Sequence, residues 1–182
     1  MTVIELRQYT LRPGRRDELI DLFEREFVEA QEECGMRIVG TFRDLDDPDR
    51  FVWVRSFADL ETRLKALTAF YGGPVWAAHR ERANATMLDV SDARLLSPVR
   101  DFTVPGSRPG HGAEPPGTTL TAVVEPPSAP RRPGALAVLE TLDAENDFPR
   151  LPVRTDRVRV TFTREDVPGA LRLSPTGRSL LR

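Results

Sequence analysis

The chain has one cysteine, one lysine and two histidines among 182 residues. The single cysteine, Cys34, excludes an intrachain disulfide and any zinc or iron–sulfur site that needs several cysteine ligands. Because Cys34 lies on the apolar side of a predicted helix, we expect a buried and inert thiol. All other basic residues are arginine, with Lys65 as the only lysine. This bias is typical of a GC-rich genome, and we expect an actinobacterial source.

Charge of one sign is not concentrated anywhere along the chain. The 26 basic and 28 acidic residues are interspersed and give a formal net charge of −2. A basic stripe that could neutralise a phosphate backbone is therefore missing, and we expect no nucleic-acid partner. No stretch approaches the ~18 consecutive apolar residues of a membrane span, and the first residues do not read as a signal peptide. We expect a cytoplasmic protein with no membrane partner.

Motifs for cofactors and metals are missing as well. The sequence has no Gly-x-Gly-x-x-Gly, no P-loop and no Gly-x-Ser-x-Gly, so nucleotide-cofactor and serine-hydrolase functions have no support. His79 lacks a second histidine at one-turn spacing, and the acidic turn at residues 44–49 lacks the glycine and terminal glutamate of a calcium loop. We expect neither a metal nor a bound cofactor.

The residues that are present suit a globular fold. Hydrophobic residues make up 40% of the chain and include nine phenylalanines, which is enough for a core in one ordinary domain or two small ones. Alternation predicts strands at residues 3–10, 36–44, 50–57 and 93–99. Apolar residues at helical spacing predict a helix at residues 15–34 and another from residue 60 to the Gly72–Gly73 break, followed by a helical piece at residues 74–85. This order is the ferredoxin-like βαββαβ arrangement.

The second half has a different character. Residues 101–117 are rich in proline and glycine and are predicted to form a linker. Beyond it, strands are predicted at residues 119–124, 135–141 and 157–163, with a weaker candidate at residues 171–173. The prolines between the first two strands forbid a helix. We therefore divide the chain into a ferredoxin-like domain (residues 1–100), the linker, and a degenerate, mostly β second repeat (residues 118–182).

Two stretches of the first half carry a resemblance. IELRQYTLRPG at residues 4–14 and FVWVRSFADLETRLKALTAFYGGPVWAAHRERANATM at residues 51–87 resemble the bacterial branch of the NIPSNAP family, within the dimeric α/β-barrel superfamily. The resemblance covers most of residues 2–99. It implies an α+β fold in which the helices cover one face of the sheet and a second sheet covers the other, enclosing a barrel with a pocket inside. If the second half supplied a complete covering sheet, one chain could close its own barrel. Since the second half lacks helices and looks thin, we expect a homodimer to supply the cover.

Polar side chains on two strands are the first candidates for function. Glu5, Arg7 and Tyr9 share one strand face, and Phe51, Trp53, Arg55 and Phe57 share another. We expect these odd-numbered side chains to line the barrel interior, and the even-numbered Val52, Val54 and Ser56 to pack against the helices. An arginine framed by aromatic rings can hold a carboxylate or enolate oxygen. The alternative is an ion-pair ladder, with Arg55 and Glu5 tying the sheet together.

A second group of candidates lies on the last helical piece. Histidine is the residue type best suited to act as a general acid or base near neutral pH, and His79 shares a helical side with Trp76, while Tyr71 and Asn84 lie close in sequence. The candidate catalytic residues are His79, Arg55, Glu5 and Tyr9. The candidate binding residues are Arg7, Trp53, Tyr71, Trp76 and Asn84. A purely structural role for His79 is the alternative.

The family resemblance permits two functions. One is binding of a small aromatic or carboxylate-bearing molecule, extended to cofactor-independent catalysis of the cyclase, isomerase, dehydratase or monooxygenase type. The other is a non-catalytic ligand-binding or dimeric scaffold protein.

Overall fold

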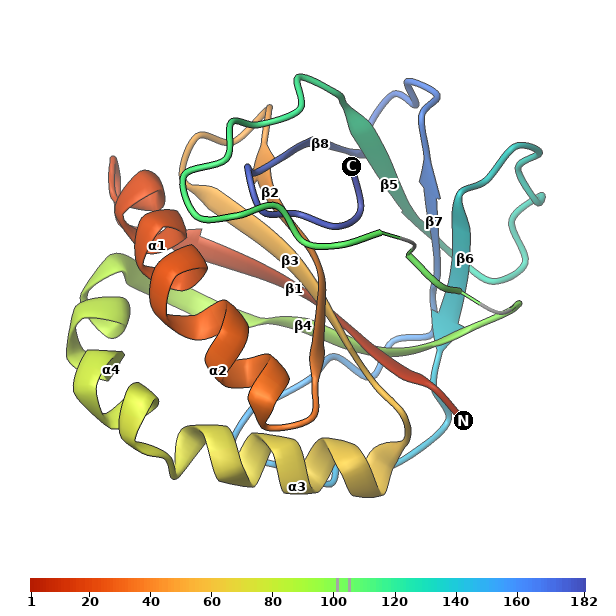
Figure 1. The fold of residues 1–182 in the computed structure, drawn as a ribbon. Coiled ribbons are helices and arrows are strands. Elements are labelled where there is room, and N and C mark those ends of the chain that lie inside the picture. The colour runs from red at the N-terminus through yellow and green to blue at the C-terminus, as the bar shows by residue number, and fades with distance from the viewer. Residues whose placement is uncertain (101, 105) are drawn as a thin grey trace.

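The computed structural model describes residues 1–100, 102–104 and 106–182. Asp101 and Pro105, two residues of the predicted linker, lie outside the described residues. The described chain forms a closed barrel with the strand order β1-β3-β2-β8-β5-β7-β6-β4. Every pair of neighbouring strands is antiparallel. Helices lie against one side of this barrel only (Figure 1), so the fold is α+β.

The first half confirms the predicted βαββαβ order. Its elements are β1 (Val3–Leu11), α1 (Arg16–Leu22), η1 (Phe23–Phe27), α2 (Val28–Glu33), β2 (Arg37–Asp44), β3 (Arg50–Phe57), α3 (Leu60–Tyr71), α4 (Pro74–Thr86) and β4 (Met87–Pro98). The first predicted helix thus contains a π-helical turn, a feature that often accompanies functional sites. The Asp59 carboxylate caps α3 by accepting from the Thr62 amide at 2.8 Å, as side-chain capping requires.

The second half supplies four strands and, in its described residues, no helix. They are β5 (Leu120–Glu125), β6 (Ala137–Thr141), β7 (Arg159–Thr163) and β8 (Leu171–Pro175). Their order in the sheet, β8-β5-β7-β6, repeats the order β4-β1-β3-β2 of the first half. The division into a first domain and a degenerate second repeat stays a prediction. The pairs β2–β8 and β4–β6 join the halves, so one chain closes its own barrel and needs no partner for that purpose.

The predicted assignment of side chains to the two sheet faces is wrong. The even-numbered Ile4, Leu6, Val52 and Val54 lie in the cluster that fills the barrel, together with Phe42, Leu120, Leu139, Val160, Phe162 and Leu173. The odd-numbered Tyr9, Phe51, Trp53 and Phe57 lie in the other cluster, together with the helix residues Leu19, Phe23, Phe27 and Phe70.

The width of the barrel explains this reversal. An eight-stranded barrel is just wide enough to be filled by side chains, and aliphatic groups fill it without unpaired polar atoms. The bulky and charged side chains Trp53, Arg7 and Arg55 are fully buried on the outer face of the sheet. The helices cover this face, and residues from other parts of the chain also reach into the space between the helices and the sheet.

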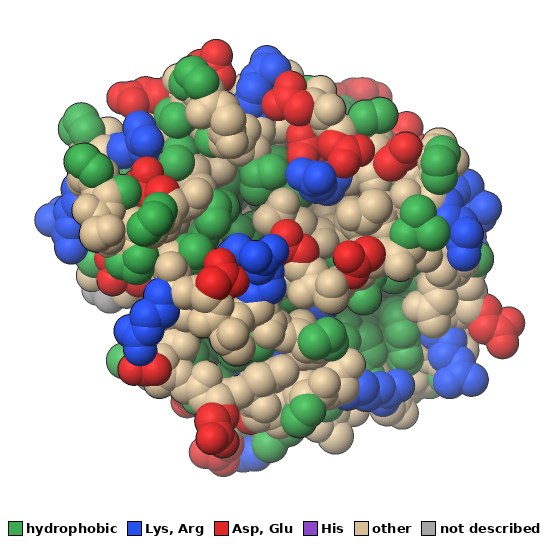
Figure 2. All heavy atoms as spheres, turned by 180° about the vertical axis from the view of Figure 1, so that it is seen from behind, with side chains coloured by type: hydrophobic (Ala, Val, Ile, Leu, Met, Phe, Trp, Pro, Cys, Tyr) green, Lys and Arg blue, Asp and Glu red, His purple; other side chains and the backbone are tan. Residues whose placement is uncertain are grey.

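The linker and the chain end pack on the first half. Arg108 donates to the Ile38 carbonyl at 2.6 Å and contacts Glu32. Arg178, in the segment after β8, donates to the Glu24 carbonyl and pairs with Glu29. Acidic and basic side chains are interspersed on the face seen in Figure 2, as the composition predicts. None of the helices in the described ranges combines the length and the apolar character that a membrane crossing requires.

Candidate functional site

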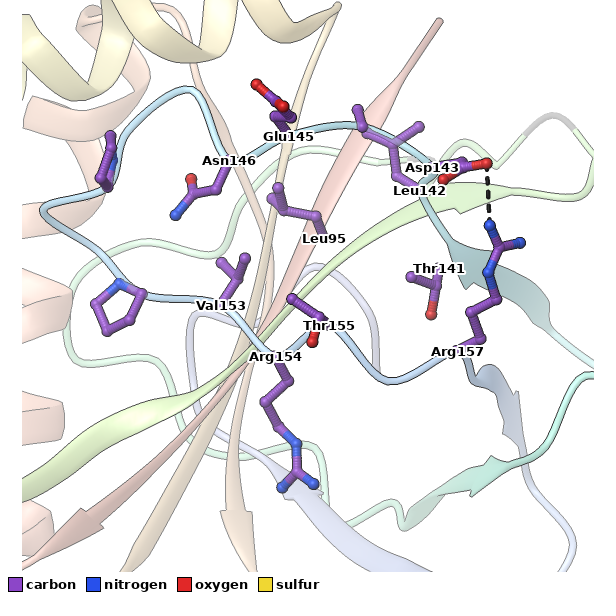
Figure 3. A pocket seen from close by; sticks show the side chains of 13 residues that line it. Leu95, Thr141, Leu142, Asp143, Glu145, Asn146, Val153, Arg154, Thr155 and Arg157 are labelled. Atoms are coloured by element: carbon purple, nitrogen blue, oxygen red, sulfur yellow. Dashed lines mark ion pairs between the residues drawn. The ribbon is translucent and has the colours of Figure 1, made fainter.

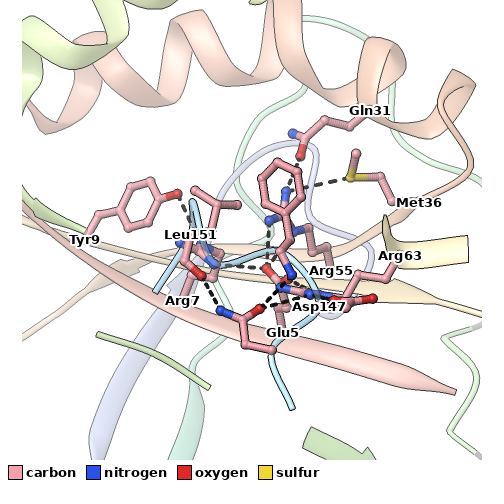
Figure 4. Close-up of polar contacts among 11 residues, drawn as sticks. Glu5, Arg7, Tyr9, Gln31, Met36, Arg55, Arg63, Asp147 and Leu151 are labelled. Atoms are coloured by element: carbon pink, nitrogen blue, oxygen red, sulfur yellow. Dashed lines mark hydrogen bonds and ion pairs between the residues drawn. The ribbon is translucent and has the colours of Figure 1, made fainter. Parts of the chain in front are cut away.

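A buried charge cluster lies between the sheet and the helices, centred on Glu5 of β1. The Glu5 carboxylate accepts from Arg55 Nε at 2.8 Å and from Arg63 Nε at 2.7 Å. Arg7 Nη1 donates to the same carboxylate at 3.0 Å. All four side chains are 0% exposed. Figure 4 shows the three guanidinium groups converging on Glu5 from β1, β3 and α3.

Glu5, Arg7 and Arg55 lie together as predicted, whereas Arg63 was not predicted to join them. The helical spacing of Leu60, Leu64 and Leu67 predicts a buried leucine stripe on α3, but Leu64 is 41% exposed and Arg63 is fully buried. Arg63 stands three residues after Leu60 and four before Leu67, at the spacing of one helical face. A charged residue inside an otherwise apolar face was therefore the available signal.

The electrostatics of the cluster keep Glu5 ionised. Burial alone raises the pKa of Glu5, but the charges of Arg55, Arg7 and Arg63 outweigh it and lower the pKa from 4.5 to about 2. Burial likewise lowers the pKa of Arg7, and the neighbouring Tyr9 and Glu5 overcome this and raise it above its ordinary value. Three positive charges therefore face the buried Glu5 and, at the edge of the cluster, Asp147, and the cluster keeps an excess of positive charge.

Several donors of this cluster have no partner. Arg7 Nη2, Arg63 Nη2 and Trp53 Nε1 are buried and make no hydrogen bond to any described residue. Arg55 Nη2 also lacks a well-directed hydrogen bond, although it lies 2.7 Å from Glu5 Oε2. Unsatisfied buried donors cost about 1–3 kcal/mol each and are rare in native proteins. Their concentration beside excess positive charge is the arrangement expected of a site for an anion.

Aromatic rings form the walls of the cluster. The Arg55 guanidinium lies 4.8 Å from the Trp53 ring centroid, within the range of a cation–π contact. Tyr9 accepts from Arg7 Nε at 3.2 Å and lies edge-on to Trp53 at 5.8 Å. Phe23 of the π-helical turn lies 4.9 Å from Trp53. The rings restrict the arginines to defined directions.

Tyr71 also belongs to this site. Burial raises the pKa of its phenol, and the charges of Arg55 and Arg7 act on it from nearby. The hydroxyl forms no hydrogen bond with a described residue. At neutral pH Tyr71 is therefore protonated, and its O–H group can donate a hydrogen bond.

The residues of α4 lie apart from the cluster. His79 Nε2 lies 3.4 Å from Glu26 Oε2, its ring packs edge-on against Phe27, and its side chain is 30% exposed. Among the described residues, no hydrogen bond or ion pair joins His79 to Glu5 or its arginines. Asn84 is exposed. Trp76 packs against Tyr71 at 5.0 Å between ring centroids, so it adjoins the site through Tyr71. The structure does not bring His79 and Asn84 to Arg55, because His79 faces Glu26 and Phe27 of η1 and Asn84 is exposed.

The connection from β6 to β7, residues 142–158, covers the cluster, and the sequence analysis did not foresee this. Asn146 Oδ1 accepts from Arg63 Nη1 at 3.2 Å, and Asp147 forms an ion pair with the same guanidinium. Phe148 stacks on Tyr71 with 6.1 Å between ring centroids. A connection this long without regular structure is unusual in a compact domain and is commonly functional.

A groove of about 710 Å³ lies between this connection and β4. Its floor includes Leu95, which pairs directly with Glu5 in the sheet. Asn146 and Val153 line it from the connection (Figure 3). Since Asn146 also bonds to Arg63, the groove adjoins the buried cluster. In the described part of the chain, no three histidine, cysteine, aspartate or glutamate side chains gather into a set that could hold a metal ion.

The family model described as NIPSNAP matches residues 4–101. A NIPSNAP family protein from Agrobacterium tumefaciens has a similar structure, with a TM-score of 0.51 and 22% identity over 57% of this chain and 97% of that one. A NIPSNAP-like domain protein from Burkholderia xenovorans gives a TM-score of 0.50 and 26% identity, over 57% and 90% of the two chains. None of the curated proteins compared with the chain matches it.

A further structure spans both halves. A protein from Fusobacterium nucleatum, whose name proposes a monooxygenase, gives a TM-score of 0.54 over 96% of this chain and 91% of that one. Its sequence is 8% identical, so the likeness concerns the fold alone. The two NIPSNAP structures correspond to little more than half of this chain, whereas this one extends over the whole barrel.

Proposed function

This chain belongs to the NIPSNAP family, and we propose that it binds a small anionic organic molecule at the cluster formed by Glu5, Arg7, Arg55 and Arg63. One observation carries the proposal. Three fully buried guanidinium groups share a single buried carboxylate, and two of them hold an Nη2 group without a partner. An anion that accepted from these groups would satisfy the donors and offset the excess positive charge.

The surroundings favour an organic anion over a simple inorganic one. Leu95, Leu142 and Val153 give the neighbouring groove an apolar lining, while Trp53 and Tyr9 present flat rings toward Arg7. Ligand sites typically combine an apolar lining with a few directed polar groups. The best-matched ligand has a flat carbon body and a carboxylate or enolate at one end.

Cofactor-independent catalysis is the further step of the proposal. In this step Arg7 and Arg55 would stabilise an oxyanion that develops on a bound carbonyl compound, and the protonated Tyr71 hydroxyl would donate to it. Glu5, with a pKa of about 2, is too weak a base to abstract a carbon-bound proton, and its role is to hold the arginines in position. His79 is left out of this set because it lies apart from the cluster.

The test is a thermal-shift and calorimetry panel of aromatic carboxylates, each paired with its neutral amide. Ligand at about one hundred times its dissociation constant adds about 2.7 kcal/mol of stability, which raises the melting temperature. We expect carboxylates to stabilise the protein and amides of the same shape to fail. Arg63→Gln should abolish the shift. Arg80→Gln, which replaces an exposed arginine of α4, should preserve it.

A second variant protects the test against misfolding. If Arg63→Gln does not fold, Arg7→Lys keeps the positive charge but removes Nη2, and it should weaken carboxylate binding without loss of the fold. Equal shifts with carboxylates and amides, or shifts that survive both changes, would refute an anion site at this cluster.

A non-catalytic structural role is the second candidate, and the packed barrel favours it. The barrel interior is filled by buried side chains such as Leu6, Val54 and Phe162, so it offers no room for the pocket that the sequence analysis expected there. In this case the charge cluster would only tie β1, β3 and α3 together. No compound of the panel would then change the melting temperature.

A further inference from the structure

Asp147 brings a carboxylate to the edge of the buried cluster. It belongs to the β6–β7 connection and pairs with Arg63 Nη1, while Glu5 takes Nε of the same guanidinium. The Arg63 side chain is 0% exposed and that of Asp147 is 22% exposed. A surface segment of the second half therefore neutralises part of the charge that the first half buries. In Figure 4 the Asp147 side chain reaches toward Arg63 beside Glu5.

The ion pair with Asp147 engages only part of the Arg63 guanidinium. Asp147 contacts Nη1, and Nη2 has no hydrogen-bond partner among the described residues. A carboxylate with freedom to orient itself can take both terminal nitrogens of a guanidinium in the bidentate geometry, which is the stronger arrangement. Asp147 is tethered to its backbone and does not achieve it. A free carboxylate therefore has an advantage over the resident one.

The backbone around Asp147 is held mainly at its two ends. The Leu142 amide donates to the Leu95 carbonyl at 2.9 Å, and the Arg154 amide donates to the Ala93 carbonyl at 2.7 Å. Between these anchors the only backbone-to-backbone bond among the described residues is local, from Leu151 to Phe148 at 3.0 Å. The Asn146 side chain adds bonds to the Leu151 carbonyl and the Phe148 amide within the segment, and Phe148, Leu151 and Val153 pack against the core. Few backbone bonds tie residues 143–153 to the rest of the chain, which favours local opening around Asp147.

The groove of about 710 Å³ supplies space for the body of a ligand whose carboxylate takes this place. Leu95 and Val153 make it apolar, and Asn146 connects it to Arg63. We infer that the site takes a monocarboxylate with an apolar body, and that the ligand displaces Asp147 from Arg63, so that Asp147 acts as a built-in competitor. This inference rests on the proposed function and names its ligand class and its anchoring residue.

Benzoate is the probe, with benzamide as its neutral counterpart. Removing the competitor with Asp147→Asn should tighten benzoate binding by roughly tenfold, because a larger fraction of the protein is then competent to bind. Asp21→Asn is the matched control. Asp21 pairs with Arg25 on the surface of the helical layer, both side chains are more than half exposed, and Asp21 does not line the groove, so this change should leave the dissociation constant within twofold. Isothermal titration calorimetry measures all three proteins.

The outcomes test the displacement of Asp147 and the proposed anion site separately. Binding of benzoate to the wild type, with tighter binding only in Asp147→Asn, supports the inference. Equal or weaker binding in Asp147→Asn overturns it while the proposed anion site stands. Failure of every carboxylate of the panel to bind the wild type and both variants overturns the proposed function itself.

A measurement on the wild type covers the case in which Asp147→Asn does not fold. Amide hydrogen exchange of residues 143–153 should become faster when benzoate binds, since displaced Asp147 no longer holds the connection down. Slower or unchanged exchange in the presence of bound benzoate would show that the ligand enters beneath an undisturbed segment, and would refute the displacement.

Discussion

Glu5→Gln removes the only carboxylate at the centre of the buried cluster while keeping the shape of the side chain. Glutamine resembles protonated glutamate in size and leaves Arg55, Arg63 and Arg7 facing one another without the central negative charge. Breaking a buried ion pair from one side is costly because the remaining charges stay buried. The variant should therefore fold into a less stable protein.

The size of the effect follows from the pKa of Glu5. The arginines lower it from 4.5 to about 2, and each pH unit between the folded and unfolded values corresponds to about 1.4 kcal/mol. The ionised carboxylate thus contributes about 3 kcal/mol at neutral pH. Because the folded pKa is the lower one, this contribution is complete above pH 4.5 and is lost as the pH falls from 4.5 toward 2.

Urea unfolding of the wild type and Glu5→Gln at pH 7 and pH 3.5 tests this reasoning. We expect a difference of about 3 kcal/mol in the free energy of unfolding at pH 7, and a clearly smaller difference at pH 3.5, where part of the contribution of Glu5 is already lost. Glu61→Gln is the control, since Glu61 forms a surface pair with Lys65 in which both side chains are more than 70% exposed. It should change stability far less and without this pH dependence. A Glu5→Gln protein as stable as the wild type, or an equal loss at both pH values, would refute the account of the cluster.

Three more outcomes are expected from the packing. Gly177→Ala should destabilise the protein by about 1–3 kcal/mol in urea unfolding, because the new Cβ would lie 1.8 Å from the Ala113 carbonyl oxygen. Gly110→Ala, where a Cβ meets nothing within 4 Å, should be close to neutral. Phe162→Ala should cost about 3–5 kcal/mol, because the ring is fully buried in the barrel; a small loss would mean a loosely filled interior. His79→Ala should leave benzoate affinity within twofold in calorimetry, and a larger loss would place the histidine in the site after all.

Local patterns predicted the elements of the fold well. Alternation located β1 and β3, and the break at Gly72 ended α3 as expected. The weak candidate at residues 171–173 is a strand, β8. These features depend on neighbours within a few residues, so the sequence displays them directly. The π-helical turn at Phe23–Phe27 gave no such signal, because its apolar spacing also suits an ordinary α-helix.

The orientation of the strand faces could not be predicted in the same way. Alternation shows that Glu5 and Arg7 share a face of the strand, but it does not show whether that face points toward the helices or into the barrel. The prediction relied on a polar barrel pocket, and the observed barrel is filled by Leu6, Val54 and other apolar residues. Arg63 and Asp147 reach the cluster from α3 and from the β6–β7 connection. Contacts between residues so far apart in sequence produce no periodic pattern from which they could be predicted.

The closed barrel also changes the argument for a homodimer. That expectation rested on a second half too thin to cover the sheet, yet β5 to β8 form a complete second sheet and pair with β2 and β4 of the same chain. A four-stranded sheet needs no helices of its own to cover another, because alternating apolar residues such as Leu120, Ala122 and Val160 suffice. The described residues of the second half contain no helix, and the β6–β7 connection extends over the helix side of the first half. The second half thus serves both faces of the sheet: its strands close the barrel, and its longest connection places Asp147 at the charged cluster. The homodimer stays a prediction, and any such interface would have to use a surface other than the one that closes the barrel.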